Sequence, residues 1–228
     1  IDEEVLLDTL RQNHRLLKFQ IIFALINHEI NIERASKEFS LLAQATFDTS
    51  LKIAESRIIK KYKINNLSYS IVAYGRFATL SMTANSDLDL VFIYDSKNSN
   101  NNSEQKIYIE LFRQLIRTLS SKTTEGLMYE VDTKLRPSGK EGPVVCTYDN
   151  FKKYHQENSF CWEKLALKKT RIINENNFNA KTSKLLEKLK TINISDKEIA
   201  REIAMMRTNI NQADGHVVKK RSFKWFET

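Results

Sequence analysis

The chain has 228 residues and a formal net charge of +8, a length that allows one large domain or two small ones around a sizeable core. Two cysteines are too few for a disulfide framework and lack zinc-ligand spacing, so we expect free thiols in a reducing cytoplasm. The longest strongly apolar stretch, residues 19–26, is far shorter than the ~20 residues of a membrane span, which excludes a membrane protein. The positive charge favours an anionic partner.

The first half of the chain changes its apolar period once. Apolar residues recur at intervals of three and four over 3–27 and 32–62, which predicts two antiparallel helices. β-branched and aromatic residues then dominate 67–77 and 88–95, which predicts two strands around a turn. An Asn- and Ser-rich surface loop at 96–106 leads into a helix predicted from about 104 to 121.

The second half is punctuated by one turn. Alternation over 126–135 predicts a third strand, which stops at 136–143, where both prolines and two of the five glycines lie. Beyond this turn we predict a short helix capped by Asp149 and a second helix over 160–173. Residues 180–228 are predicted to be helical and basic.

Two aspartates stand at the mouth of the second predicted strand, in the sequence NSDLDLVFIYD. Because a strand alternates its faces, Asp87 and Asp89 point the same way while Leu88 and Leu90 point into the core. Two carboxylates so close raise one pKa unless a cation joins them, and hard oxygen ligands suit Mg²⁺. A solvated strand end is an equally good interpretation of the pair alone.

The context of the pair carries a resemblance. YGRF, SDLDLVFIYD, GLMYEVDTKLRPSGKEGPVV and YHQENSFCWEKLALKKTRII follow one another within residues 65–175. Together they resemble the nucleotidyltransferase domain of the bifunctional glutamine synthetase adenylyltransferases, a branch of the polymerase-beta-like superfamily. The resemblance implies an α+β fold, with a nucleotidyltransferase core at 65–175 between helical segments at 1–64 and, incomplete, at 176–228.

The resemblance also implies a reaction and its residues. Mg²⁺ and ATP would serve to transfer AMP to a tyrosine hydroxyl of glutamine synthetase, without a covalent enzyme intermediate. Asp87, Asp89 and Asp132 would be catalytic and would bind two Mg²⁺ ions, although Glu130 shares the strand face of Asp132 and spacing alone does not choose between them. Seven further residues would bind the ATP phosphates: Gly75, Arg76, Thr79, Ser86, Arg136, Lys169 and Arg171.

The sequence departs from the family pattern at three places. Ala78 and Thr79 replace two glycines of the phosphate-binding turn, so we expect weaker ATP binding or a reshaped turn, since glycine accepts positive φ and close approach. Lys134 stands where the family has arginine and lacks its fork geometry. The chain also ends before the family's Gly-rich segment, so we expect a fragment, a truncated paralogue or a decaying copy with weakened turnover.

Several alternatives stay open. The related enzymes have one domain that adds AMP and one that removes it by phosphorolysis, and YEVD with RPSG favours the adding domain. A module that only docks glutamine synthetase is a second class, and regulation by a PII-type protein would need segments absent here. A nucleic-acid polymerase is a third class, suggested by Lys219, Lys220 and Arg221; we do not expect it, because the basic residues are scattered among acids.

Overall fold

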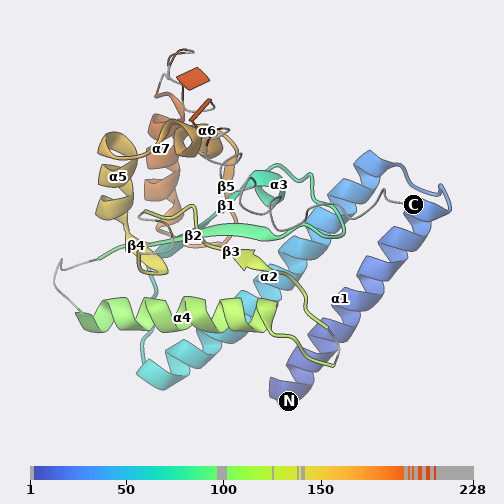
Figure 1. Cartoon of the computed structure of the whole chain (residues 1–228). Helices are drawn as coiled ribbons and strands as arrows, with labels where there is room; N and C mark the ends of the chain where they lie inside the picture. Colours follow the sequence, from blue (N-terminus) through green and yellow to red (C-terminus); the bar gives the residue numbers. More distant parts are fainter. Residues whose placement is uncertain are drawn as a thin grey trace, which may run out of the picture.

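The structure, a computed structural model, describes residues 3–96, 102–124, 126–137, 139 and 142–192, with residues 195, 197, 200, 201, 204, 205 and 208. A small mixed sheet lies between two layers of helices (Figure 1). Part of the loop predicted at 96–106 and the basic sequence at 219–221 lie outside the described residues. No helix in the described part of the chain is both long and apolar enough to cross a membrane.

Two long helices open the chain, as predicted. Helix α1 spans Glu3–Ile26 and α2 spans Ile32–Tyr62, and the two run antiparallel (Figure 1). The side chain of Asn31 caps α2 by accepting a hydrogen bond of 2.8 Å from the backbone N–H of Arg34, which satisfies one of the free donors at a helix start. The apolar period of the sequence therefore translates directly into this hairpin.

The sheet is built around β2. Within the described residues its five strands are β1 (Tyr69–Tyr74), β2 (Leu88–Tyr94), β3 (Val131–Asp132), β4 (Val145–Thr147) and β5 (Thr170–Ile172). Their order is β3-β2-β1-β5, and β4 also pairs with β2. Strand β1 is antiparallel to β2 and β5, whereas β3 and β4 run parallel to β2. The two strands predicted before residue 96 are confirmed, but the third is only two residues long.

Around the sheet lie the helices α3 (Gly75–Ala78), α4 (Asn102–Ser120), α5 (Tyr148–Glu157), α6 (Cys161–Leu167) and α7 (Asn179–Lys190). The helix predicted over 160–173 is wrong beyond Leu167, because the next residues join the sheet edge as β5 and pair with β1. The predicted cap of α5 is also wrong. Thr147 is the N-cap, and Asp149 lies in the first helical turn.

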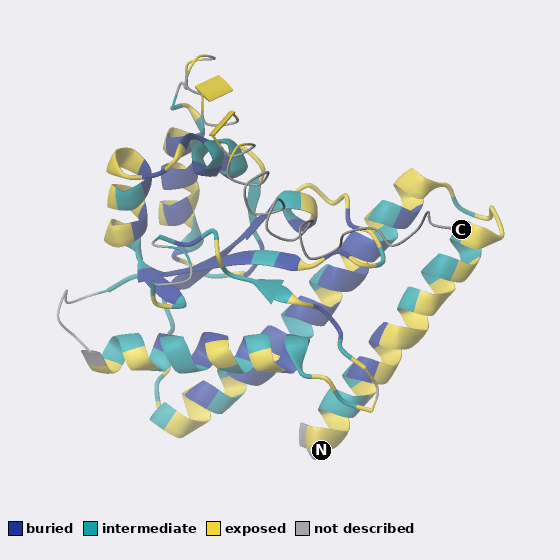
Figure 2. Cartoon of the chain, viewed as in Figure 1, coloured by how far each residue is buried: buried dark blue, intermediate teal, exposed yellow. Residues whose placement is uncertain are grey.

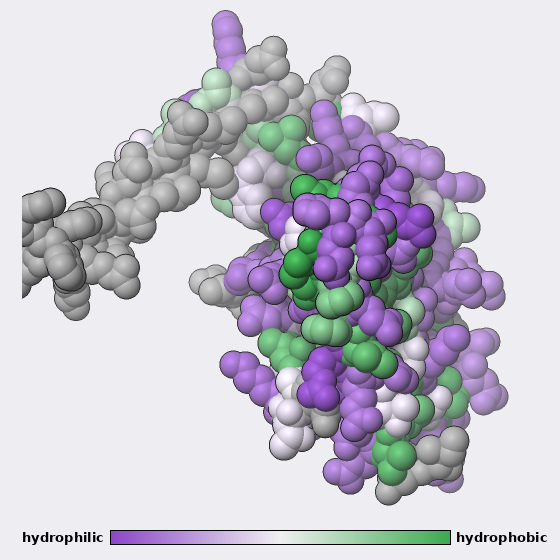
Figure 3. Space-filling model, turned by 90° about the vertical axis from the view of Figure 1, so that its right-hand side faces the viewer, coloured by the Kyte–Doolittle hydropathy of each residue, from purple (hydrophilic) through white to green (hydrophobic). Residues whose placement is uncertain are grey.

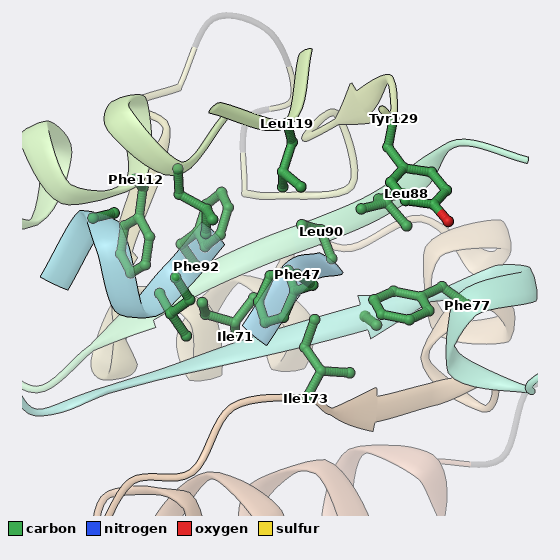
Figure 4. Close-up of a cluster of buried hydrophobic side chains, with 14 of the residues drawn as sticks. Phe47, Ile71, Phe77, Leu88, Leu90, Phe92, Phe112, Leu119, Tyr129 and Ile173 are labelled. Atoms are coloured by element: carbon green, nitrogen blue, oxygen red, sulfur yellow. The ribbon is translucent and has the colours of Figure 1, made fainter. Parts of the chain in front are cut away.

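Both faces of the central strands are buried (Figure 2). Ile71 and Phe92 belong to the face covered by α2 and α4, where Phe47 and Phe112 meet them (Figure 4). The rings of Phe92 and Phe112 stack with centroids 4.1 Å apart and an interplanar angle of 15°. Val72 belongs to the opposite face, which packs against α5 and α7. Burial on two faces explains why β1 and β2 are almost continuously apolar.

The predicted division at residues 64 and 175 stays a prediction. One core cluster joins Ile58 of α2 to Ile71 of β1 and to Ile173, so it includes residues on both sides of position 64. The side of α1 turned away from the sheet is less well covered. There, hydrophobic side chains lie among hydrophilic ones (Figure 3). Over the whole of α1, the exposed large hydrophobic residues are Val5, Leu6, Leu16, Leu17, Phe19, Phe23 and Ile26.

Candidate active site

Strand β2 positions Asp89. Its neighbours Leu88 and Leu90 are fully buried on the α2–α4 face, and alternation therefore turns Asp89 toward the other face of the sheet. Asp89 is half-buried, whereas Asp87, immediately before the strand, is exposed. The core packing of two leucines thus presents one carboxylate from within the sheet and a second from its entrance.

The pairing of β2 with β3 brings in the third carboxylate. Asp89 lies directly opposite Asp132 in the parallel register, and the N–H of Leu88 donates to the carbonyl of Glu130 at 2.9 Å. Neighbouring strands lie about 4.8 Å apart, so the two aspartates stand side by side. The register therefore selects Asp132 over Glu130 as the partner of Asp89, a choice that spacing within one strand could not make.

The environment of Asp89 favours its neutral form. Burial is the largest cause, followed by the charges of Asp87 and Asp132, while Lys134 acts in the opposite direction; together they raise the pKa of Asp89 from 3.8 to about 6. A carboxylate that is partly desolvated beside like charges behaves in this way. A nearby positive charge would therefore stabilise the ionised form of the three carboxylates.

Lys134 supplies part of that charge. Its backbone N–H donates to Oδ1 of Asp132 at 2.8 Å, and its Nζ lies 2.5 Å from Oδ2. The lysine side chain is 57% exposed and that of Asp132 24%. Asp132 is thus held through both oxygens by the residue two positions later.

Gly75 lies against the carboxylate of Asp89. Its φ is +58°, and a Cβ at this position would stand 3.0 Å from Oδ2 of Asp89. Glycine is the residue that adopts this backbone conformation without steric cost. Any other residue at the start of α3 would strain the backbone and press its Cβ against the carboxylate.

The turn after Gly75 keeps a regular backbone at the two replaced glycines. Ala78 lies within α3 and Thr79 has φ −91°, so neither position needs glycine for its φ. The positive φ falls one residue later, on exposed Leu80 at +55°. The hydroxyl of Thr79 donates to the carbonyl of Gly75 at 3.1 Å and lies 2.7 Å from Oγ of Ser81. Thr79 therefore stabilises the turn itself.

Ser86 closes the turn that leads into the acidic pair. Its buried Oγ accepts a hydrogen bond of 2.9 Å from the N–H of Thr83 and lies 3.0 Å from the hydroxyl of the same residue. The N–H of Ser86 in turn donates to the carbonyl of Thr83 at 3.1 Å. These contacts fix the backbone immediately before Asp87.

Two of the four predicted cationic residues are engaged within the fold. The guanidinium of Arg136 is buried and donates to the carbonyls of Pro143 at 2.9 Å and Gly142 at 3.0 Å, and to Oγ1 of Thr133 at 2.8 Å. These bonds close the loop between Thr133 and Pro143. Arg136 lines the same cleft as Asp132, with a guanidinium directed at loop carbonyls.

Arg171 is directed away from the carboxylates. It pairs with Ala73 in the sheet and extends toward α2, where it donates to Oε1 of Gln44 at 3.1 Å and to the carbonyl of Phe77 at 3.1 Å. A longer contact of 3.4 Å reaches the carbonyl of Ala78. Arg171 therefore stabilises the C-terminal end of α3 through hydrogen bonds to its carbonyls.

The other two cations, Arg76 and Lys169, are exposed, and no hydrogen bond or ion pair joins either side chain to a residue in the described ranges. They are the predicted phosphate ligands whose charge is open to solvent.

A polar cleft of about 380 Å³ brings part of the predicted site together. Its lining residues are Asp87, Glu130, Val131, Asp132, Thr133, Lys134 and Arg136. A larger groove of about 460 Å³ between α1 and α2 is lined mostly by apolar residues. We place the chemistry at the smaller cleft, since the clustered carboxylates line it.

A known protein family matches most of the chain. The family described as "Glutamate-ammonia ligase adenylyltransferase" matches residues 1–186, which include α1, the whole sheet and the carboxylates. The chain belongs to this family.

Similar curated proteins carry the name "Bifunctional glutamine synthetase adenylyltransferase/adenylyl-removing enzyme". The adenylyltransferase-family protein of Brucella melitensis is 32% identical over 220 residues, which cover 92% of this chain and 22% of that protein. The protein of Rhodopseudomonas palustris strain HaA2 is 29% identical over 93% of this chain and 22% of its own length. That of Mesorhizobium japonicum is 33% identical over 75% and 18%. The chain therefore spans about a fifth of the length of these relatives.

The donor set of the adenylyltransferase-family site fits the metal that the family resemblance implies. Three aspartates offer only hard oxygen atoms, the ligands that Mg²⁺ prefers, and the ammonium of Lys134 already occupies a cation position on Asp132. Within the described residues, no three His, Cys, Asp or Glu side chains yet stand in a ready metal-binding group. Metal binding would therefore require the carboxylates and Lys134 to rearrange.

Two features of the adenylyltransferase-family site escaped sequence reasoning. The sequence predicts Lys134 only as a weaker replacement for arginine, and its spacing of two residues from Asp132 is the available signal for the ion pair. The resemblance places Arg171 among the phosphate ligands, and only the strand β5 reveals that it faces α2.

Proposed function

We propose that this chain transfers AMP from ATP to a tyrosine hydroxyl of glutamine synthetase. The observation that carries the proposal is the parallel register of Asp89 and Asp132, which sets two carboxylates side by side next to Asp87. Family membership and the printed names of the relatives support glutamine synthetase as the target. The proposal also includes a cytoplasmic location and regulation by a PII-type protein.

In this proposal the carboxylates bind the metal ions and the exposed cations bind the phosphates. Asp87, Asp89 and Asp132 would hold two Mg²⁺ ions, which when bound neutralise the triphosphate and lower the pKa of the attacking hydroxyl. Arg76 and Lys169, the exposed cations, would bind phosphate oxygens. The tyrosine oxygen forms a bond to the α-phosphorus in line as the bond to pyrophosphate breaks, so positioning and charge stabilisation supply the catalysis.

The phosphate-binding turn would act through its backbone. The N–H groups of Thr79 and Ser81 already donate to the carbonyls of Gly75 and Arg76 at 3.1 and 3.0 Å, so a phosphate cradle falls to the remaining amides of the turn. Arg171 and Ser86 would keep this backbone in place from either side. Both are thus positioning residues in the proposal.

A second candidate is a module that docks glutamine synthetase without transferring AMP. It is favoured by the ammonium of Lys134 on Asp132 and by the guanidinium of Arg136, which donates to loop carbonyls. The AMP-removing reaction is a third candidate, because attack by phosphate on AMP-tyrosine would use the same carboxylates.

One experiment separates the three. The chain is incubated with glutamine synthetase, Mg²⁺ and ATP labelled at the α-phosphate, beside Asp89→Asn, Asp132→Asn and the control Asp149→Asn, an exposed aspartate on α5. We expect labelled synthetase with wild type and the control, and a loss of at least about 100-fold with the two site variants.

The same preparation tests the alternatives. Transfer that is absent in wild type while labelled ATP still binds would replace the proposal by the docking module. Release of labelled ADP from pre-labelled synthetase on addition of phosphate, without transfer from ATP, would assign the AMP-removing reaction instead.

A further inference from the structure

Lys134 is held in place at both ends. Its Nζ and its backbone N–H contact the two oxygens of one carboxylate, that of Asp132. Its backbone is fixed on one side by the pairing of Asp132 with Asp89. On the other side, Arg136 donates to Oγ1 of Thr133 at 2.8 Å. Both the backbone of Lys134 and the Asp132 carboxylate that its ammonium contacts are therefore held in place.

The two cationic side chains that line the polar cleft contact different kinds of groups. Asp87, Glu130 and Asp132 line it together with Lys134 and Arg136, and the guanidinium of Arg136 is directed at the carbonyls of Gly142 and Pro143. Lys134 is a cation whose charged group contacts a carboxylate of the site. It sits where two further negative charges also face the cleft.

The contact is close but exposed. More than half of the lysine side chain is open to water, and ion pairs of this kind are weak and easily exchanged. A divalent cation has twice the charge of the ammonium and prefers carboxylate oxygens. Such an ion can therefore replace the lysine on Asp132, at the cost of breaking the pair.

We infer that Lys134 is a built-in counter-ion of the acidic cluster, which a divalent cation must displace from Asp132, so that this lysine lowers the cation affinity of the site. The inference rests on the proposed function, because it takes Asp132 as a cation ligand. It adds a specific role: Lys134 holds the carboxylates in a folded, charge-compensated state without metal and makes cation binding a competition.

Binding of Mn²⁺ to the full chain, without ATP or glutamine synthetase, tests the inference. Free Mn²⁺ is followed by electron paramagnetic resonance for wild type, Lys134→Met, Lys134→Arg and the control Lys181→Met. Lys181 forms a comparable exposed ion pair of 2.9 Å with Asp95, at the far end of β2. Asp132→Asn reports whether the bound ion uses this cleft.

We expect Lys134→Met to bind Mn²⁺ about three- to ten-fold more tightly than wild type, because the competing charge is gone. Lys134→Arg and Lys181→Met should stay within about two-fold of wild type, and Asp132→Asn should lose binding. Thermal unfolding of each variant without metal checks that it is folded.

The failures are distinguishable. Wild-type binding that Asp132→Asn abolishes and Lys134→Met leaves unchanged or weakens would overturn the counter-ion role and leave the proposed function intact. Absence of binding in both wild type and Lys134→Met at millimolar Mn²⁺ would overturn the metal site itself, and the counter-ion role with it.

Discussion

Gly75 and Asp89, fourteen residues apart, lie against each other at the start of the turn that follows β1. A Cβ at Gly75 would lie 3.0 Å from Oδ2 of Asp89, and the φ of Gly75 is +58°. One glycine therefore meets two demands at once: a left-handed backbone and close approach to a carboxylate.

Gly75→Ala should therefore disturb the site more than the fold. We expect a loss of about 1–2 kcal/mol in unfolding free energy from the positive φ, and at least about ten-fold weaker Mn²⁺ binding because the carboxylate must move. Gly126→Ala is the matched control, since Gly126 has φ +91° with nothing within 4 Å of an added Cβ. Its stability should fall while Mn²⁺ binding stays normal; equal binding by both variants would contradict the prediction.

Asp89 should make the metal-free protein less stable as pH rises. The pKa of Asp89 is about 6 in the fold against 3.8 ordinarily, so the folded state binds this proton more tightly than the unfolded state. That contribution to stability is present below 3.8 and is lost as pH rises through about 6.

Asp89→Asn removes the ionisable group and with it the loss of stability at rising pH. Relative to wild type, we expect its unfolding free energy in urea to rise by about 1–3 kcal/mol between pH 4 and pH 8. Asp149→Asn, measured in the same way, serves as the exposed control. A difference from wild type that is independent of pH would show that Asp89 is not perturbed.

Loss of the positive charge should lower the stability of the protein at Arg171 and weaken ATP binding at Lys169. Arg171→Met leaves the carbonyls of Phe77 and Ala78 without their donor, so we expect about 2–3 kcal/mol lower stability in urea unfolding. Lys169→Met should leave stability within about 0.5 kcal/mol, because the side chain is exposed, and should weaken binding of a fluorescent ATP analogue several-fold. Unchanged ATP binding by Lys169→Met would remove Lys169 from the phosphate site.

Leucine should be strained at position 80, because the backbone φ there is positive. It has φ +55° and is 44% exposed, and asparagine tolerates this conformation better than a bulky aliphatic residue. Leu80→Asn should therefore raise the unfolding free energy by about 0.5–1 kcal/mol. Leu41→Asn, at a 60% exposed position inside α2, should lower it by a similar amount because asparagine is a weak helix former. A loss of stability in both variants would show that Leu80 is not strained.

Several features of the fold follow from local sequence. The periods of α1, α2 and α4 and the apolar runs of β1 and β2 predicted these elements within a few residues. Local pattern failed at residues 160–173, where one apolar stretch divides into α6 and β5. Residues 170–172 become a strand because β1 has a free edge beside them, and an edge contributed from a hundred residues away has no local signature.

The sequence by itself determined the acidic pair of Asp87 and Asp89 and the family, because these depend on residue type and on the order of short motifs. Only the tertiary structure decided which acid faces Asp89, which glycine touches it, and that Arg171 supports the turn from the α2 side. The physical reason is register. Strand pairing joins segments far apart in the chain, and a shift of two residues would have placed Glu130 instead of Asp132 opposite Asp89.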